Sequence, residues 1–62
     1  MLKFEYYLYN RETDRYIYSE DFSKLYETYN NLVSFEKVLG VSVLDEYGST
    51  QISEILLEYK EL

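Results

Sequence analysis

The chain has 62 residues, a formal net charge of −6, and neither cysteine nor histidine. These properties indicate one domain at most, residues 1–62, and they exclude disulfides, thiolate metal sites and the commonest general base. The six basic residues are scattered along the chain, so direct binding to nucleic acid or to an anionic membrane is disfavoured.

The first predicted element is a β-hairpin. Residues 2–9 alternate, with large apolar or aromatic side chains at the even positions, and a second strand at residues 15–19 follows a polar turn. Ile17 is the most apolar residue of the second strand and should share a face with Leu8. This register gathers four rings on the opposite face: Tyr7, Tyr9, Tyr16 and Tyr18.

A helix should follow the hairpin. Ser19 is the predicted N-cap, acidic side chains fill the first turn, and apolar residues recur at helical spacing between positions 22 and 33. The helix ends either near Asn31 or at Leu39, where Gly40 would serve as the C-terminal cap. The sequence does not decide between these two positions for the C-terminal end of the helix.

The second half of the chain predicts a third strand at residues 41–47 and a turn at Gly48. Apolar side chains from Ile52 to Leu62 fit a helix, with glutamates on its other side, and we favour this structure because both faces match the helical period. Residues 55, 57 and 59 also alternate as a strand would. The expected fold is therefore α+β, a small two-layer sandwich in the order ββαβα, with ββαββ as the alternative.

The expected topology follows from a right-handed crossover. The third strand would lie parallel to the second and beside the first, in the order 2-1-3, and the helices would cover the face that carries Leu8. The expected core consists of Leu8, Ile17, Phe22, Leu25, Tyr29 and Val43.

The principal candidate site is the tyrosine face, which we define as Tyr7, Tyr9, Tyr16 and Tyr18. If all helices pack on the other face, these rings point outward. Tyrosine offers a large contact area at low entropic cost and is enriched in protein interfaces, which predicts a protein-binding surface. The alternative is that the rings only stabilise the hairpin as cross-strand pairs.

A second candidate is an acidic face on a C-terminal helix, made of Glu54, Glu58 and Glu61. Carboxylates about 6 Å apart along a helix have roughly the spacing of phosphates along a nucleic-acid strand. Such a face could imitate nucleic acid toward a basic partner. The alternative is a solvated surface that keeps the protein soluble.

No feature of the sequence predicts catalysis or a cofactor. Asp45 and Glu46 precede the glycine turn, but no third ligand stands at a metal-binding spacing. The chain has no nucleophile elbow, P-loop or dinucleotide fingerprint, so we assign no catalytic, cofactor-binding or metal-binding residue. We do not expect an enzyme.

The expected function is that of a small acidic protein-binding module. The absence of alanine and proline, with many tyrosines, indicates an AT-rich genome and suggests an accessory protein of a phage or mobile element that inhibits or modulates a host protein. The alternative is a structural or assembly subunit that associates with itself, for example as a homodimer. A charged residue precedes any apolar run of signal-peptide length, so we expect a cytoplasmic protein.

Overall fold

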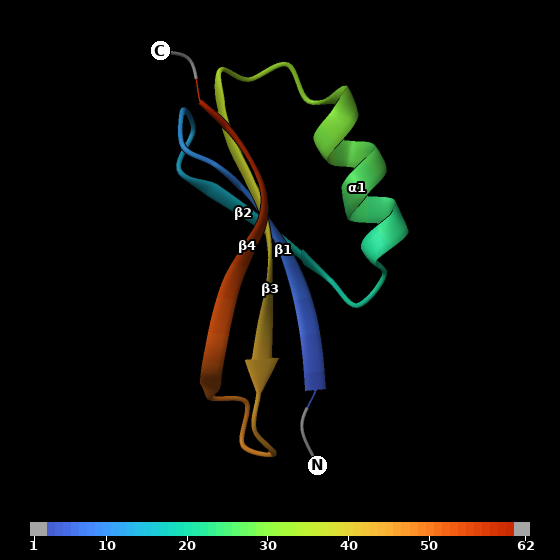
Figure 1. Ribbon diagram of the computed structural model, residues 1–62, viewed down its shortest axis with the longest axis vertical. Coiled ribbons are helices and arrows are strands. Elements are labelled where there is room, and N and C mark those ends of the chain that lie inside the picture. Colours follow the sequence, from blue (N-terminus) through green and yellow to red (C-terminus); the bar gives the residue numbers. More distant parts are fainter. Residues whose placement is uncertain (1–2, 61–62) are drawn as a thin grey trace.

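The computed structural model describes residues 3–60 as a four-stranded antiparallel sheet with one helix packed on one face (Figure 1). In chain order the elements are β1 (Lys3–Asn10), β2 (Arg15–Ser19), α1 (Phe22–Asn31), β3 (Glu36–Leu44) and β4 (Thr50–Lys60). The strand order β2-β1-β3-β4 confirms that the third strand lies beside the first. The fold is α+β in the order ββαββ, so the C-terminal helix of the preferred ββαβα order is wrong.

The hairpin of β1 and β2 has the predicted register, with Leu8 opposite Ile17, Tyr9 opposite Tyr16 and Tyr7 opposite Tyr18. Residues directly opposite each other in antiparallel strands project from the same face. The four tyrosines therefore lie on one side of the sheet and Leu8 lies on the other. Asp14 closes the turn with a positive φ of 54°, a conformation that aspartate tolerates better than most residues.

The beginning of α1 differs from the prediction. Asp21, and not Ser19, is the N-cap, and its carboxylate accepts a hydrogen bond from the Lys24 N–H. Ser19 is the last residue of β2, and its hydroxyl accepts a hydrogen bond from the Asp21 N–H. Ser19 therefore contributes indirectly: it holds the backbone of Asp21, and Asp21 caps the helix.

The helix ends at Asn31, which is the shorter of the two predicted lengths. The Lys37 ammonium donates hydrogen bonds to the carbonyl groups of Tyr29 and Leu32, and it lies 4.4 Å from the centre of the Tyr29 ring. A cation at this end of a helix satisfies carbonyls that have no partner within the helix. Gly40 caps no helix and lies inside β3.

The second half of the chain is two long paired strands. β3 begins at Glu36 rather than at Val41, and β4 pairs with it from Thr50 to Lys60. Pairing gives the backbone of both strands a hydrogen-bond ladder, which an isolated C-terminal helix would not supply to β3. Leu62, which the sequence placed in the last element, and Leu2, which it placed in the first strand, lie outside the described residues.

A β-bulge explains why β4 has a helical pattern in its sequence. Leu57 lies opposite Leu39, but the next pair along the ladder joins Ile55 to Gly40, so β4 carries one extra residue there. The extra residue shifts the two-residue alternation, so Ile52 and Leu57, five residues apart, share the side of α1, while Ile55 lies on the other side. Periodicity alone cannot distinguish such a strand from an amphipathic helix.

The core is small and lies mainly between α1 and the sheet. The buried apolar residues are Leu8, Leu25, Tyr29, Val38 and Leu39. Three of the predicted core residues are thus confirmed, but Ile17 is 49% exposed, and Phe22 and Val43 are half-buried. The reason is incomplete coverage, because α1 packs on β1, β2 and β3 but makes no contact with β4 within residues 3–60.

Candidate functional site

The tyrosine face lies on the side of the sheet opposite α1. Two rows of side chains cross the sheet there, Tyr16–Tyr9–Val38 and Tyr18–Tyr7–Gly40. Tyr16 and Tyr18, on the edge strand β2, are 51% and 56% exposed, whereas Tyr7 and Tyr9 are half-buried. The structure brings the four predicted tyrosines together on one face. Tyr16 and Tyr18 are the two that are accessible to a partner.

The four rings form one continuous array. The centre of the Tyr16 ring lies 4.3 Å from that of Tyr9 and 5.7 Å from that of Tyr18, both in stacked geometry. Tyr7 lies 6.2 Å from Tyr16 at a tilted angle. Aromatic pairs contribute about 0.5–1.5 kcal/mol each beyond the area they bury. Rings that already hold one another in place lose little freedom when a partner binds.

Tyr7 is anchored to the neighbouring strands. A Cβ atom at Gly40 would lie 2.3 Å from the Cζ and Oη atoms of Tyr7, so the ring occupies space that any other residue would fill. The Tyr7 hydroxyl reaches β4, where the Ser53 hydroxyl donates to it at 3.4 Å. Tyr7 therefore supports the tyrosine face from within the sheet.

Tyr9 is anchored to the hairpin turn. Its hydroxyl donates a hydrogen bond of 2.7 Å to the Asp14 carboxylate. This hydrogen bond, followed by desolvation and by the negative charge of Asp14, raises the pKa of Tyr9. The hydrogen bond therefore fixes the Tyr9 ring against the turn and favours its neutral phenol.

Two residues that the sequence did not assign to this surface extend it toward β4. Glu58 lies opposite Val38 and forms an ion pair of 3.0 Å with Arg11, and Ile55 lies opposite Gly40 with 55% of its surface exposed. Pairing between distant strands places them near the tyrosines. The spacing of residues 55, 57 and 59 was the sign of a strand in the sequence, but the bulge places Ile55 on the opposite face from Leu57 and Tyr59.

No protein family, no characterised protein and no solved structure matches this chain. No helix within residues 3–60 is long and apolar enough to cross a membrane. In the same part of the chain, no three histidine, cysteine, aspartate or glutamate side chains gather closely enough to hold a metal ion. Function must therefore be inferred from the chemistry of the surface.

The acidic face predicted on a C-terminal helix is not formed. Glu54 and Glu58 lie in β4, and the bulge between them places them on opposite faces of the sheet. Glu54 lies opposite Val41, on the side of α1, and Glu58 is on the side of the tyrosine face. Glu61 lies outside the described residues. Side chains four residues apart in a regular strand would share a face, so the extra residue is what separates these two.

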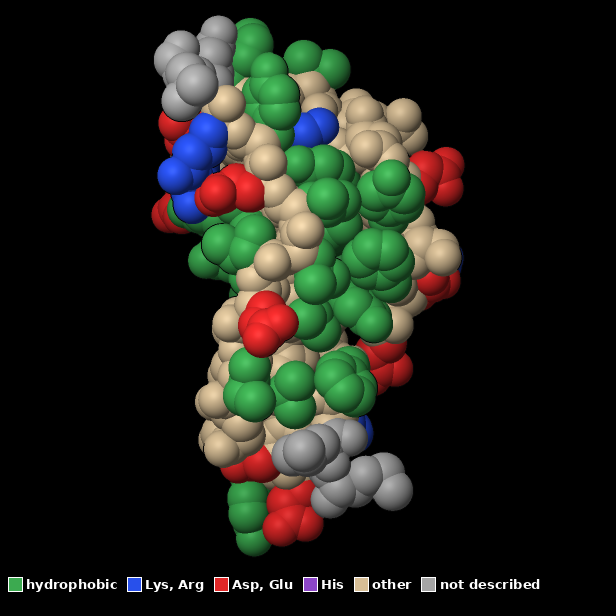
Figure 2. Space-filling view, in the orientation of Figure 1, with side chains coloured by type: hydrophobic (Ala, Val, Ile, Leu, Met, Phe, Trp, Pro, Cys, Tyr) green, Lys and Arg blue, Asp and Glu red, His purple; other side chains and the backbone are tan. Residues whose placement is uncertain are grey.

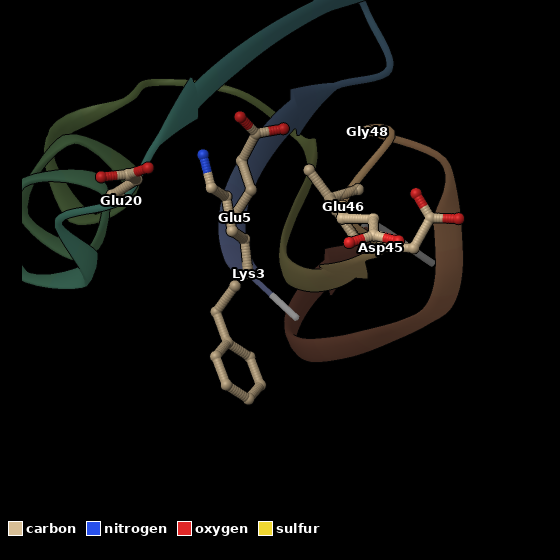
Figure 3. A pocket seen from close by; sticks show the side chains of 8 residues that line it. Lys3, Glu5, Glu20, Asp45, Glu46 and Gly48 are labelled. Carbon is tan, nitrogen blue, oxygen red and sulfur yellow. The ribbon is translucent and has the colours of Figure 1, made fainter. Parts of the chain in front are cut away.

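An acidic hollow of about 300 Å³ lies beside the turn between β3 and β4 (Figure 3). The charged residues that line it are Glu5, Glu20, Asp45, Glu46 and Lys3. Asp45 is already engaged, because its carboxylate accepts hydrogen bonds from the N–H groups of Tyr47 and Ser49 and from the Gln51 amide. Asp45 therefore holds the turn together. The Lys3 ammonium, on the other side of the hollow, points into the space between Glu5 and Glu20 (Figure 3).

A polar cluster that the sequence did not reveal fastens the hairpin to the rest of the molecule. The Glu12 carboxylate accepts hydrogen bonds from the Ser34 hydroxyl at 2.6 Å and from the Phe35 N–H. These two hydrogen bonds, the first being the stronger influence, lower the pKa of Glu12. Ser34 is buried and faces a carboxylate that is itself engaged, so its role here is structural. The cluster fixes the turn of the hairpin that carries the tyrosine face.

Proposed function

We propose that this protein is a small, non-enzymatic protein-binding module that contacts its partner through the tyrosine face. The observation that carries the proposal is the stacked pair Tyr16 and Tyr18, half-exposed on the side of the sheet without a helix. Clustered exposed aromatic area of this kind marks interaction sites in small soluble domains. Tyrosine is also among the residues that dominate binding energy at protein interfaces.

The partner in this proposal is a host protein whose activity the module inhibits or modulates. The net charge of −6 favours a partner surface of positive potential, because complementary charge raises the rate of encounter. The composition that suggests an AT-rich phage or mobile element gives the choice of host, which is a low-GC bacterium.

The proposal is tested by affinity capture from a low-GC bacterial lysate, with quantitative mass spectrometry of the retained proteins. Replacing both Tyr16 and Tyr18 by serine should remove the specific partner, because each truncated ring at an interface centre costs about 2 kcal/mol or more. Tyr47→Ser is the matched control, since Tyr47 is 86% exposed in the turn between β3 and β4. It should retain the partner.

Circular dichroism of each variant shows whether the fold is intact. A folded Tyr16→Ser/Tyr18→Ser protein that captures the same partner as the wild type would contradict the proposal. Light scattering over a range of concentrations tests the alternative of self-association. A wild-type dimer that the double substitution dissociates would make a second copy of this chain the partner.

A further inference from the structure

The opposite side of the sheet is only half covered. Adjacent strands are about 4.8 Å apart and a helix is roughly 10 Å wide, so two helices side by side are needed to cover four strands. Residues 3–60 supply one helix, which packs on β1, β2 and β3. All eleven residues of β4 are exposed, and the ribbon of β4 has no helix over it (Figure 1). One helix position beside α1 is empty within the described part of the chain.

The empty position has an apolar floor, which we call the bare strip. Its apolar residues are Phe4, Val43, Ile52, Leu57 and Tyr59, which the strand register places on the side of α1. Ile52 is 56% exposed, and every other member is exposed or half-buried. Figure 2 shows hydrophobic side chains of the sheet and of the helix adjoining on this view of the molecule.

The border of the bare strip is formed by aromatic residues of α1. Phe22 packs edge-on against Tyr6 at 5.2 Å and stacks on Tyr26 at 5.7 Å. Tyr6 lies in one row of the sheet with Val41 and Glu54, so this side of the helix is next to the strip. α1 contacts β1 and both of its neighbours, and packed helices have axes 8–10 Å apart, so a second helix beside α1 would lie over β4, two strand spacings from β1.

Charge decides what kind of helix fits. Glu54 stands within the strip, opposite Val41, and no described side chain pairs with its carboxylate. Lys37, a cation of β3 on this face, is already bonded to the carbonyls at the end of α1. A second copy of the chain would bring another net charge of −6 and could place Glu54 against Glu54. An amphipathic helix with a basic residue in its apolar stripe would cover the apolar side chains of the bare strip and pair with the Glu54 carboxylate.

We propose that the bare strip binds one amphipathic helix of another protein, which lies beside α1 and pairs a lysine or arginine with Glu54. The strand length, about 3.4 Å for each of eleven residues, accommodates a helix of roughly 20 residues. This site lies on the face of the sheet opposite the tyrosine face and does not depend on it.

The test uses a fluorescently labelled 20-residue peptide with leucines at helical spacing, one central lysine beside them, and alanine and glutamine elsewhere. Fluorescence anisotropy should show binding by the wild-type protein, and weaker binding of a matched peptide with glutamate in place of the lysine. Ile52→Ser should weaken binding about tenfold, because it removes apolar contact area. Ile55→Ser is the matched control, since Ile55 is equally exposed on the other face of the same strand.

Glu54→Gln should weaken binding of the lysine peptide and abolish its preference over the glutamate peptide, whereas Glu27→Gln, on the outside of α1, should change neither. Tyr16→Ser/Tyr18→Ser should bind as the wild type does. Equal losses for Ile52→Ser and Ile55→Ser, or no binding by the wild type, would overturn the proposal. So would a wild-type dimer in sedimentation that Ile52→Ser dissociates, because a second copy would then fill the strip.

If Ile52→Ser does not fold, amide chemical shifts of the wild-type protein replace it. Titration with the lysine peptide should then move the resonances of Ile52 and Leu57 and leave those of Tyr16 and Tyr18 in place. Shifts confined to the tyrosine face would overturn the proposal.

Discussion

At the scale of single residues, the hairpin is held in place by polar contacts that cross long stretches of sequence. Glu12 is in the β1–β2 turn, and its partners Ser34 and Phe35 are in the segment between α1 and β3. Both partners donate hydrogen bonds to the ionised carboxylate, so the folded state favours the charged form. This contact makes the stability of the folded protein depend on pH in the acidic range.

The first prediction concerns this carboxylate. Because the pKa of Glu12 is lowered in the folded protein, its contribution to stability is present above the unfolded pKa and is lost as the pH falls through the folded pKa. Glu12→Gln should be less stable than the wild type at neutral pH and should lose less stability on acidification below about pH 5. Urea unfolding at a series of pH values measures both effects. Glu27→Gln, an exposed control, should follow the wild type, and an unchanged acid slope in Glu12→Gln would refute the prediction.

At the scale of elements, β3 depends on a contact with β1. A glycine inside a strand normally weakens it, since glycine has high entropy when unfolded and no side chain to pack. Here the Tyr7 ring of β1 covers Gly40, and the Glu54 carbonyl of β4 lies 2.7 Å from where a Cβ atom would be. The three strands therefore approach one another closely at this point.

The second prediction follows from that approach. Gly40→Ala should destabilise the protein by about 1–3 kcal/mol, because the added methyl group forces the Tyr7 ring out of place. The loss should be smaller in a Tyr7→Ser background, where the ring is absent. Denaturant unfolding of the four proteins in this cycle measures the coupling. Ser42→Ala, in the same strand, is a control that should have little effect, and equal losses in both backgrounds would show that the ring is not responsible.

At the scale of the whole molecule, one short helix covers half of one face of a four-stranded sheet. The buried core is correspondingly small, and apolar side chains remain exposed on both faces. Chains of this size have a thin margin of stability, so each buried residue matters. Both proposed binding surfaces are consequences of this incomplete coverage.

The third prediction distinguishes the core of the structure from the core expected from the sequence. Leu39 is fully buried, so Leu39→Ala should cost about 2–5 kcal/mol and could unfold the domain. Ile17→Ala should cost much less, because about half of that side chain already contacts solvent. Thermal and urea unfolding of both variants, with an osmolyte added if Leu39→Ala is unfolded, measures the difference. Equal losses would mean that α1 covers β2 more completely than the structure shows.

The sequence by itself determined the hairpin, its register and the gathering of four tyrosines on one face. These features depend on alternation between positions close in the chain, and a slip of one residue would have moved Ile17 to the wrong side. The helical segment of α1, apart from its N-cap, and the order of the first three strands were also predictable, from helical periodicity and from the handedness of crossovers.

Tertiary structure alone decided the rest. The apolar spacing of β4 fits a helix, and only pairing with β3 makes this segment a strand, whose bulge opposite Gly40 separates Glu54 from Glu58. The burial of Leu39 and the exposure of Ile17 depend on where a ten-residue helix comes to rest on the sheet. Those outcomes result from contacts between distant segments, which the local pattern of side chains does not encode.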